Sequence, residues 1–129
     1  MNRRRIADQK GQTMVEFALV APLLCLILFA VLQFGVVYKD YVTLTDATRV
    51  GARKAATSRQ AANPPAEAEA ALRASATGLT QADLDVAVAS AWEHGEDVTV
   101  TASYPYEIDL LGLVVASGRL ESETTERVE

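Results

Sequence analysis

The chain has 129 residues, a formal net charge of −5 and a composition that is 50% hydrophobic. The negative charge is concentrated in residues 60–129, which carry three basic and thirteen acidic side chains. This excess of carboxylates argues against a nucleic-acid partner, because phosphates are contacted by Lys and Arg. The single cysteine, Cys25, leaves no possibility of a disulfide framework within the chain.

The first predicted element is a membrane-spanning helix, with the span at about residues 17–38. No side chain from Phe17 to Leu32 is charged or strongly polar, and Gln33 is the only such residue before Tyr38. About 20 apolar residues in a helix suffice to cross the hydrocarbon core of a bilayer. The run is also longer than the apolar region of a secretory signal, which argues against a signal peptide.

A basic leader of residues 1–11 precedes this helix. We expect the leader to be unstructured, with helix beginning near Gln12. The positive-inside rule predicts that the N-terminus is cytoplasmic and that the rest of the chain lies outside. The charges behind this prediction are four basic residues against the single acid Asp8: Arg3, Arg4, Arg5 and Lys10.

The helix is predicted to continue well past the membrane and to cover residues 12–62. Beyond the span, Ala47, Gly51 and Ala55 recur at helical spacing and form a stripe of small side chains, against which another backbone can approach closely. We expect the stripe to pack against the chain's own sheet. Contact with neighbouring subunits is the alternative.

Residues 63–129 are predicted to form a small acidic domain outside the membrane. Asn63 can cap a short helix that begins at Pro64, since proline is tolerated at the first helical position. The hydrophobic period then changes to two in residues 84–92 and 98–106, which flank a Gly-containing turn and indicate a hairpin.

The remaining residues give a third strand and one ambiguous segment. Residues 120–128 alternate less regularly and predict a poorer strand. The apolar segment 108–116 is expected to close the core, with an exposed partner patch as the alternative. The predicted fold class is α+β: a long N-terminal transmembrane helix continuing into a small domain with a short helix and an antiparallel sheet of about three strands.

Three segments of the chain follow one another in an order found in a known family. They are KGQTMVEFALVAPLL (residues 10–24), DATRVGARKAA (46–56) and VTVTASYPYEIDLLGL (98–113). In these segments the chain resembles the TadE-like pseudopilins of tight-adherence (Flp-type) pilus systems. Residues 60–95 take no part in the resemblance.

The resemblance implies a minor pseudopilin of the bacterial inner membrane. A prepilin peptidase would cleave after Gly11, so that Gln12 becomes the first residue, with Glu16 as the acid at the fifth position and Phe17 as the aromatic after it. The implied partners are the membrane, this peptidase, other pilin or pseudopilin subunits and the pilus assembly platform.

The spacing of these residues also has a physical rationale. A new amine on Gln12 would lie one helical turn from Glu16, and the positive end of the helix dipole favours an acid there. Gly11 would resist the helix and leave the scissile segment extended. The alternatives are that Glu16 only snorkels to the cytoplasmic headgroups and that Gly11 is an ordinary junction glycine.

The sequence offers little support for catalysis or for a metal. His94 lies among Glu93, Glu96 and Asp97 at a predicted turn, but no second His or nearby Cys completes a transition-metal site. We therefore expect no enzyme activity, cofactor or small-molecule substrate. The rival hypothesis is a permanently membrane-anchored extracytoplasmic binding protein that keeps its N-terminus.

Overall fold

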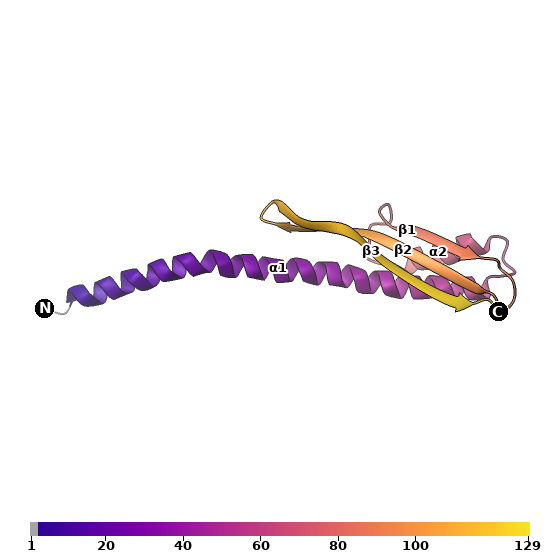
Figure 1. The fold of residues 1–129 in the computed structure, drawn as a ribbon, viewed down its shortest axis with the longest axis horizontal. Coiled ribbons are helices and arrows are strands. Elements are labelled where there is room, and N and C mark those ends of the chain that lie inside the picture. The colour runs from indigo at the N-terminus through magenta and orange to yellow at the C-terminus, as the bar shows by residue number, and fades with distance from the viewer. Residues whose placement is uncertain (1–2) are drawn as a thin grey trace.

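The computed structural model describes the backbone of residues 3–129 and the side chains of residues 11–129. A long helix leads into a compact end that holds a short helix and a three-stranded antiparallel sheet (Figure 1). This arrangement confirms the predicted α+β class. The elements are α1 (Arg3–Thr57), α2 (Pro64–Ser75), β1 (Asp85–Ser90), β2 (Asp97–Leu110) and β3 (Leu113–Arg127).

Helix α1 is a single element of 55 residues that runs through Pro22. At about 1.5 Å per residue it is roughly 80 Å long. The predicted start near Gln12 is wrong, because described helix begins at Arg3. The leader consists largely of good helix formers, and one interior glycine costs only about 1 kcal/mol relative to alanine. Residues 1–2 of the leader lie outside the described part of the chain.

The end of α1 also differs from the prediction. The helix ends at Thr57 instead of continuing to residue 62. The Ser58 N–H donates to the Ala55 carbonyl at 3.1 Å, which tightens the last turn. Helix α2 then begins as predicted, because the Asn63 side chain accepts from the Ala66 N–H at 3.3 Å.

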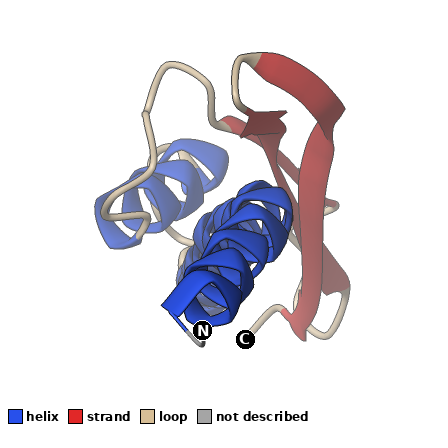
Figure 2. Ribbon diagram, turned by 90° about the vertical axis from the view of Figure 1, so that its left-hand side faces the viewer, coloured by secondary structure: helices blue, strands red, loops and turns tan. Residues whose placement is uncertain are grey.

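Helix α1 lies between α2 and the sheet when the molecule is viewed along its length (Figure 2). The sheet has the order β1-β2-β3, with both pairs antiparallel. On β2, Val98, Val100 and Ala102 are fully buried toward the helices, as the period of two predicted. Leu44 of α1 and Leu72 of α2 complete this core.

The β2–β3 hairpin is longer than expected and extends beyond β1. Strand β1 pairs only with residues 98–103, whereas β2 and β3 stay paired as far as Leu110 and Leu113. The hairpin therefore runs back along α1 and ends over the middle of the helix (Figure 1). Segment 108–116 forms this end and does not close the core, so that expectation is wrong.

Candidate assembly surface

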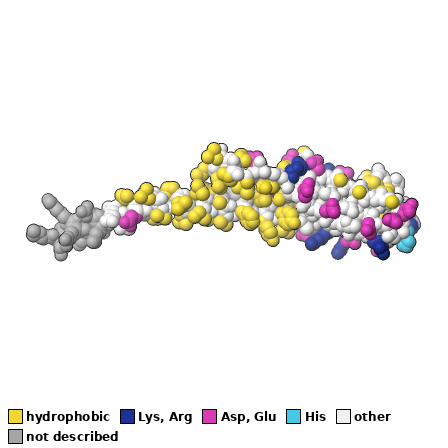
Figure 3. Space-filling model, in the orientation of Figure 1, with side chains coloured by type: hydrophobic (Ala, Val, Ile, Leu, Met, Phe, Trp, Pro, Cys, Tyr) yellow, Lys and Arg dark blue, Asp and Glu magenta, His cyan; other side chains and the backbone are white. Residues whose placement is uncertain are grey.

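Residues 17–38 of α1 form an apolar surface that the small domain leaves largely exposed. Gly11–Thr57 holds a stretch that is long and apolar enough to cross a membrane, and none of that stretch is buried. Hydrophobic side chains cover the middle of the rod, and charged ones gather over the small domain (Figure 3). A helix that is apolar all round requires lipid or other protein around it.

The residues predicted for processing lie at the head of this surface. The Gln12 side chain donates to the Glu16 carboxylate, with 3.3 Å between Nε2 and Oε1, so the two share one face of the helix. Phe17 follows and is 69% exposed. The arrangement presents a carboxylate and an aromatic ring on consecutive residues at one end of the apolar rod.

Gly11 occupies a different conformation from the one expected. It lies inside α1 and not in an extended segment, so a peptidase would have to unwind the helix locally to reach its peptide bond. Apart from the neighbouring residues and backbone of its own helix, no described atom lies within 4 Å of a Cβ built on Gly11. The space around the glycine is therefore open. Glycine weakens the helix at this point, because its backbone loses more conformational freedom than that of other residues.

The stripe of small residues lies in the interior of the compact end. Ala47 and Ala55 are fully buried. A Cβ on Gly51 would lie 3.0 Å from Leu72 Cβ and 3.4 Å from the Ala68 carbonyl oxygen, both on α2. Gly51 thus packs against α2. The sequence pattern had favoured packing of the stripe against the sheet instead. In this conformation the stripe serves the chain's own packing.

A contact that sequence reasoning missed joins the hairpin to the apolar half of α1. Gln33 Nε2 donates to the backbone carbonyl of Asp109 at 3.0 Å, across 76 residues of sequence. Gln33 is the only strongly polar side chain between Phe17 and Tyr38, and this was the one available signal. Beside this bond is an open groove of about 470 Å³, lined by Leu26, Ile27, Ala30, Val31, Phe34, Ile108, Leu110 and Val115.

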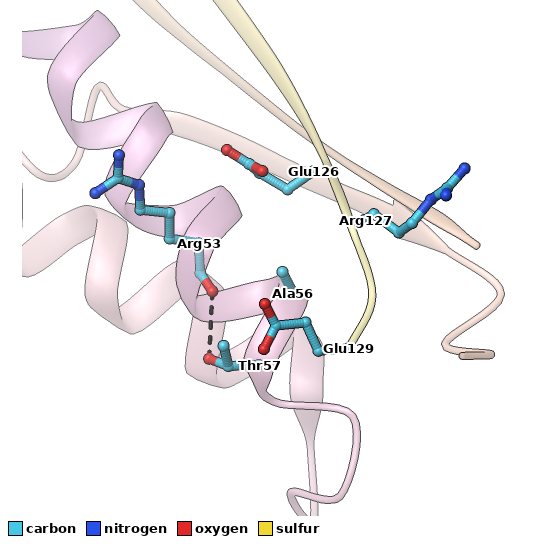
Figure 4. Close-up of a pocket in the computed structure, with 6 residues that line it drawn as sticks. All are labelled: Arg53, Ala56, Thr57, Glu126, Arg127 and Glu129. Carbon is cyan, nitrogen blue, oxygen red and sulfur yellow. Dashed lines mark hydrogen bonds between the residues drawn. The ribbon is translucent and has the colours of Figure 1, made fainter. Parts of the chain in front are cut away.

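The opposite end of the molecule has a polar hollow of about 410 Å³ where the chain's last residues meet the end of α1 (Figure 4). The Glu129 N–H donates to the Ala56 carbonyl at 3.0 Å and fixes the C-terminus there. Arg53 and Glu126 line the hollow with Glu129 and project in different directions (Figure 4). Because the hollow is lined by both basic and acidic side chains, its charge favours neither an anionic nor a cationic ligand.

The turn between β1 and β2 holds the acidic group around His94. The Gly95 N–H donates to the Val128 carbonyl at 2.9 Å, and the Val128 N–H donates to the Glu96 carbonyl at 2.8 Å. The turn thus holds the end of β3 in place through its backbone. Within residues 11–129, no three His, Cys, Asp or Glu side chains are grouped as metal ligands.

Comparison with known proteins finds one similarity. Residues 11–53 match a family described as TadE-like protein, the family that the sequence resembles. The matched segment contains Gly11, Glu16 and Gly51 and ends before Ala55. No curated protein and no solved structure matches the chain.

Proposed function

We propose that this chain, whose residues 11–53 match the TadE-like family, is a minor pseudopilin of a tight-adherence pilus system. It resides in the bacterial inner membrane as a single-pass protein, with its N-terminus in the cytoplasm and its acidic domain outside. A prepilin peptidase clips it after Gly11. Other pilin or pseudopilin subunits and the assembly platform then recruit it, and its role is mechanical and not catalytic.

The observation that carries this proposal is the exposed apolar half of α1 with its polar head. Gly11, Gln12 and Glu16 stand in sequence just before an apolar stretch in which no residue is buried. A simple anchor needs the apolar stretch alone. The Glu16 carboxylate, one turn past Gln12, is an added cost in a membrane, and pairing with an amine offsets that cost.

The charges of the leader support a change in membrane attachment when it is cleaved off. The leader carries Arg3, Arg4, Arg5 and Lys10 against Asp8. Basic residues beside a membrane are attracted to the anionic inner leaflet by about 1 kcal/mol each. Removal of residues 1–11 takes away that attraction and leaves an amine and a carboxylate at the head, which favours movement out of the bilayer.

Cell fractionation tests the proposal. The chain is produced in a bacterium with a tight-adherence system, and filaments sheared from the cells are pelleted and probed for it. We expect the chain in the sheared fraction of complete cells and only in membranes when the platform is deleted. A chain that stays in the membrane in both strains would support the anchored binding protein instead.

A further inference from the structure

The β2–β3 hairpin ends in an apolar tip, residues 108–115, that the rest of the chain leaves exposed. Leu111 is 76% exposed, Leu113 72%, Val114 55% and Val115 57%. No charged residue occurs between Asp109 and Arg119. The sheet of the acidic domain thus carries one end that is chemically unlike the rest of its surface (Figure 3).

The tip lies beside the apolar half of α1. The hydrogen bond from Gln33 to Asp109 fixes the level of the hairpin on the helix. Beyond that bond, Leu110 and Val115 line one side of a groove whose other side is formed by α1 residues as far down as Leu26. The hairpin tip therefore lies on the N-terminal side of Gln33, along the stretch that crosses the membrane.

Helix geometry gives the depth of the tip. The predicted span, residues 17–38, is about 33 Å long at about 1.5 Å per residue. This length matches a hydrocarbon core of about 30 Å and places Gln33 about 8 Å inside its outer boundary. Leu26 lies about 10 Å deeper than Gln33 on the same scale, close to the middle of the bilayer, so the tip lies within the outer leaflet.

The turn at the tip is tight and satisfies one of its own backbone donors. Leu111 and Gly112 form a two-residue turn with φ values of 56° and 84°. The Asp109 carboxylate accepts from the Gly112 N–H at 2.7 Å, so this turn donor is satisfied. A leucine at the first turn position is unusual, because Asn, Asp or Gly normally takes a positive φ there. Backbone strain is found mostly at functional sites, so a strained apolar residue at an exposed tip indicates that this residue makes a functional contact.

We propose that residues 110–115 insert into the acyl chains of the outer leaflet, as a second membrane contact beside α1. The inference rests on α1 crossing the bilayer, which is part of the proposed function. We infer lipid as the partner, because the tip lies beside α1. The exposed side chains of Leu111, Leu113 and Val114 therefore meet the same surroundings as the adjacent turns of α1. The Gln33–Asp109 bond holds the hairpin against α1, so the domain stays close to the membrane before recruitment.

Site-specific fluorescence tests this proposal on the full chain, with one copy in each lipid nanodisc. The environment-sensitive dye NBD is attached at Leu111→Cys in a Cys25→Ser background. Quenching by nitroxides on lipid acyl chains and by aqueous iodide is then measured. Glu121→Cys is the matched control on β3, about 30 Å from the turn at about 3.4 Å per residue. The native Cys25, which is exposed on the span, reports on α1 itself.

We expect the dye at residue 111 to lose most of its emission to acyl-chain nitroxides and little to iodide, as the dye at Cys25 does. The dye at residue 121 should show the reverse. Iodide quenching at residue 111, with lipid quenching at Cys25, would overturn the inference and leave the membrane span intact. Iodide quenching at Cys25 itself would overturn the span and, with it, the insertion of the tip.

Discussion

The Gln12 side chain donates to the Glu16 carboxylate across one turn of α1, with 3.3 Å between the two atoms. An exposed pair of this kind adds only a few tenths of a kcal/mol to helix stability. Its significance is therefore geometric, because it shows that the two positions share a face. An amine created on Gln12 would lie on the same turn as this carboxylate, or a neighbouring subunit's amine could take its place.

Replacing Glu16 should separate processing from assembly. We expect Glu16→Ala to be clipped like the unaltered chain but to reach the sheared filament fraction poorly, because the carboxylate that pairs with the amine is gone. Asp46→Asn is the control, since Asp46 is an exposed acid elsewhere on α1 with a surface partner, Arg49. Immunoblots of membrane and filament fractions give the measurement. Normal assembly of Glu16→Ala would rule out a role in register.

Replacing Gly11 should block processing. Alanine favours helix over glycine by about 1 kcal/mol, so Gly11→Ala strengthens the segment that has to unwind and adds a methyl group beside the scissile bond. We expect the chain to remain at precursor size on a denaturing gel. Gly35→Ala is the control, because a Cβ at either glycine meets no described atom within 4 Å outside its own stretch of helix. Unchanged processing of Gly11→Ala would reject the site.

Filling the contact between α1 and α2 should destabilise the compact end. The Cβ of Gly51→Val would meet Leu72 Cβ at 3.0 Å, and the helix backbones would have to separate. Overpacking of this kind costs about 1–3 kcal/mol. Thermal unfolding in detergent, followed by the fluorescence of Trp92, should show a lower midpoint for Gly51→Val and little change for Gly35→Val. Equal midpoints would show that the helices adjust without cost.

Arg73 is expected to stabilise the domain more than a surface arginine does. Its guanidinium donates to the Glu69 carboxylate at 2.8 Å and to the Gln81 and Leu84 carbonyls at 2.9 and 3.1 Å. Arg73→Met should lower the free energy of unfolding by about 1.5–3 kcal/mol, the range for hydrogen bonds that involve a charged group. Arg49→Met, which breaks only a surface pair, should change it by less. Chemical denaturation in detergent compares the two variants.

The order and type of the elements followed from periodicity in the sequence. The change from helical spacing to a period of two predicted β1 and β2, and Val98, Val100 and Ala102 face the core as that pattern requires. The cap at Asn63 was equally readable, because an Asn followed by Pro64 marks a helix start. These features depend on neighbours in sequence, and so the sequence alone reveals them.

Features that depend on distant residues could not be predicted in the same way. The hairpin turns at Leu111–Gly112, which lacks the Asn-Gly or Asp-Gly signal of such turns, so β3 was expected to begin later than Leu113. The bond from Gln33 ends on a backbone carbonyl, and a backbone acceptor leaves no mark in the sequence. Arg73 donates to two such carbonyls for the same reason.

The continuous helix through Gly11 has a different explanation. A short charged leader favours disorder, yet arginine and lysine are also good helix formers, and one glycine does not outweigh them. Helix at this site still agrees with processing if the peptidase draws the segment out of the helix. The roles of Gly11, Gln12, Glu16 and Phe17 therefore remain predictions about the mature chain.

The most direct test of the account is the N-terminal sequence and intact mass of the chain purified from membranes of cells with and without the prepilin peptidase. The account predicts a chain that begins at Gln12 when the peptidase is present and one that keeps residues 1–11 when it is absent. A chain that keeps its arginine-rich leader in both strains would contradict the account and leave a permanently anchored domain.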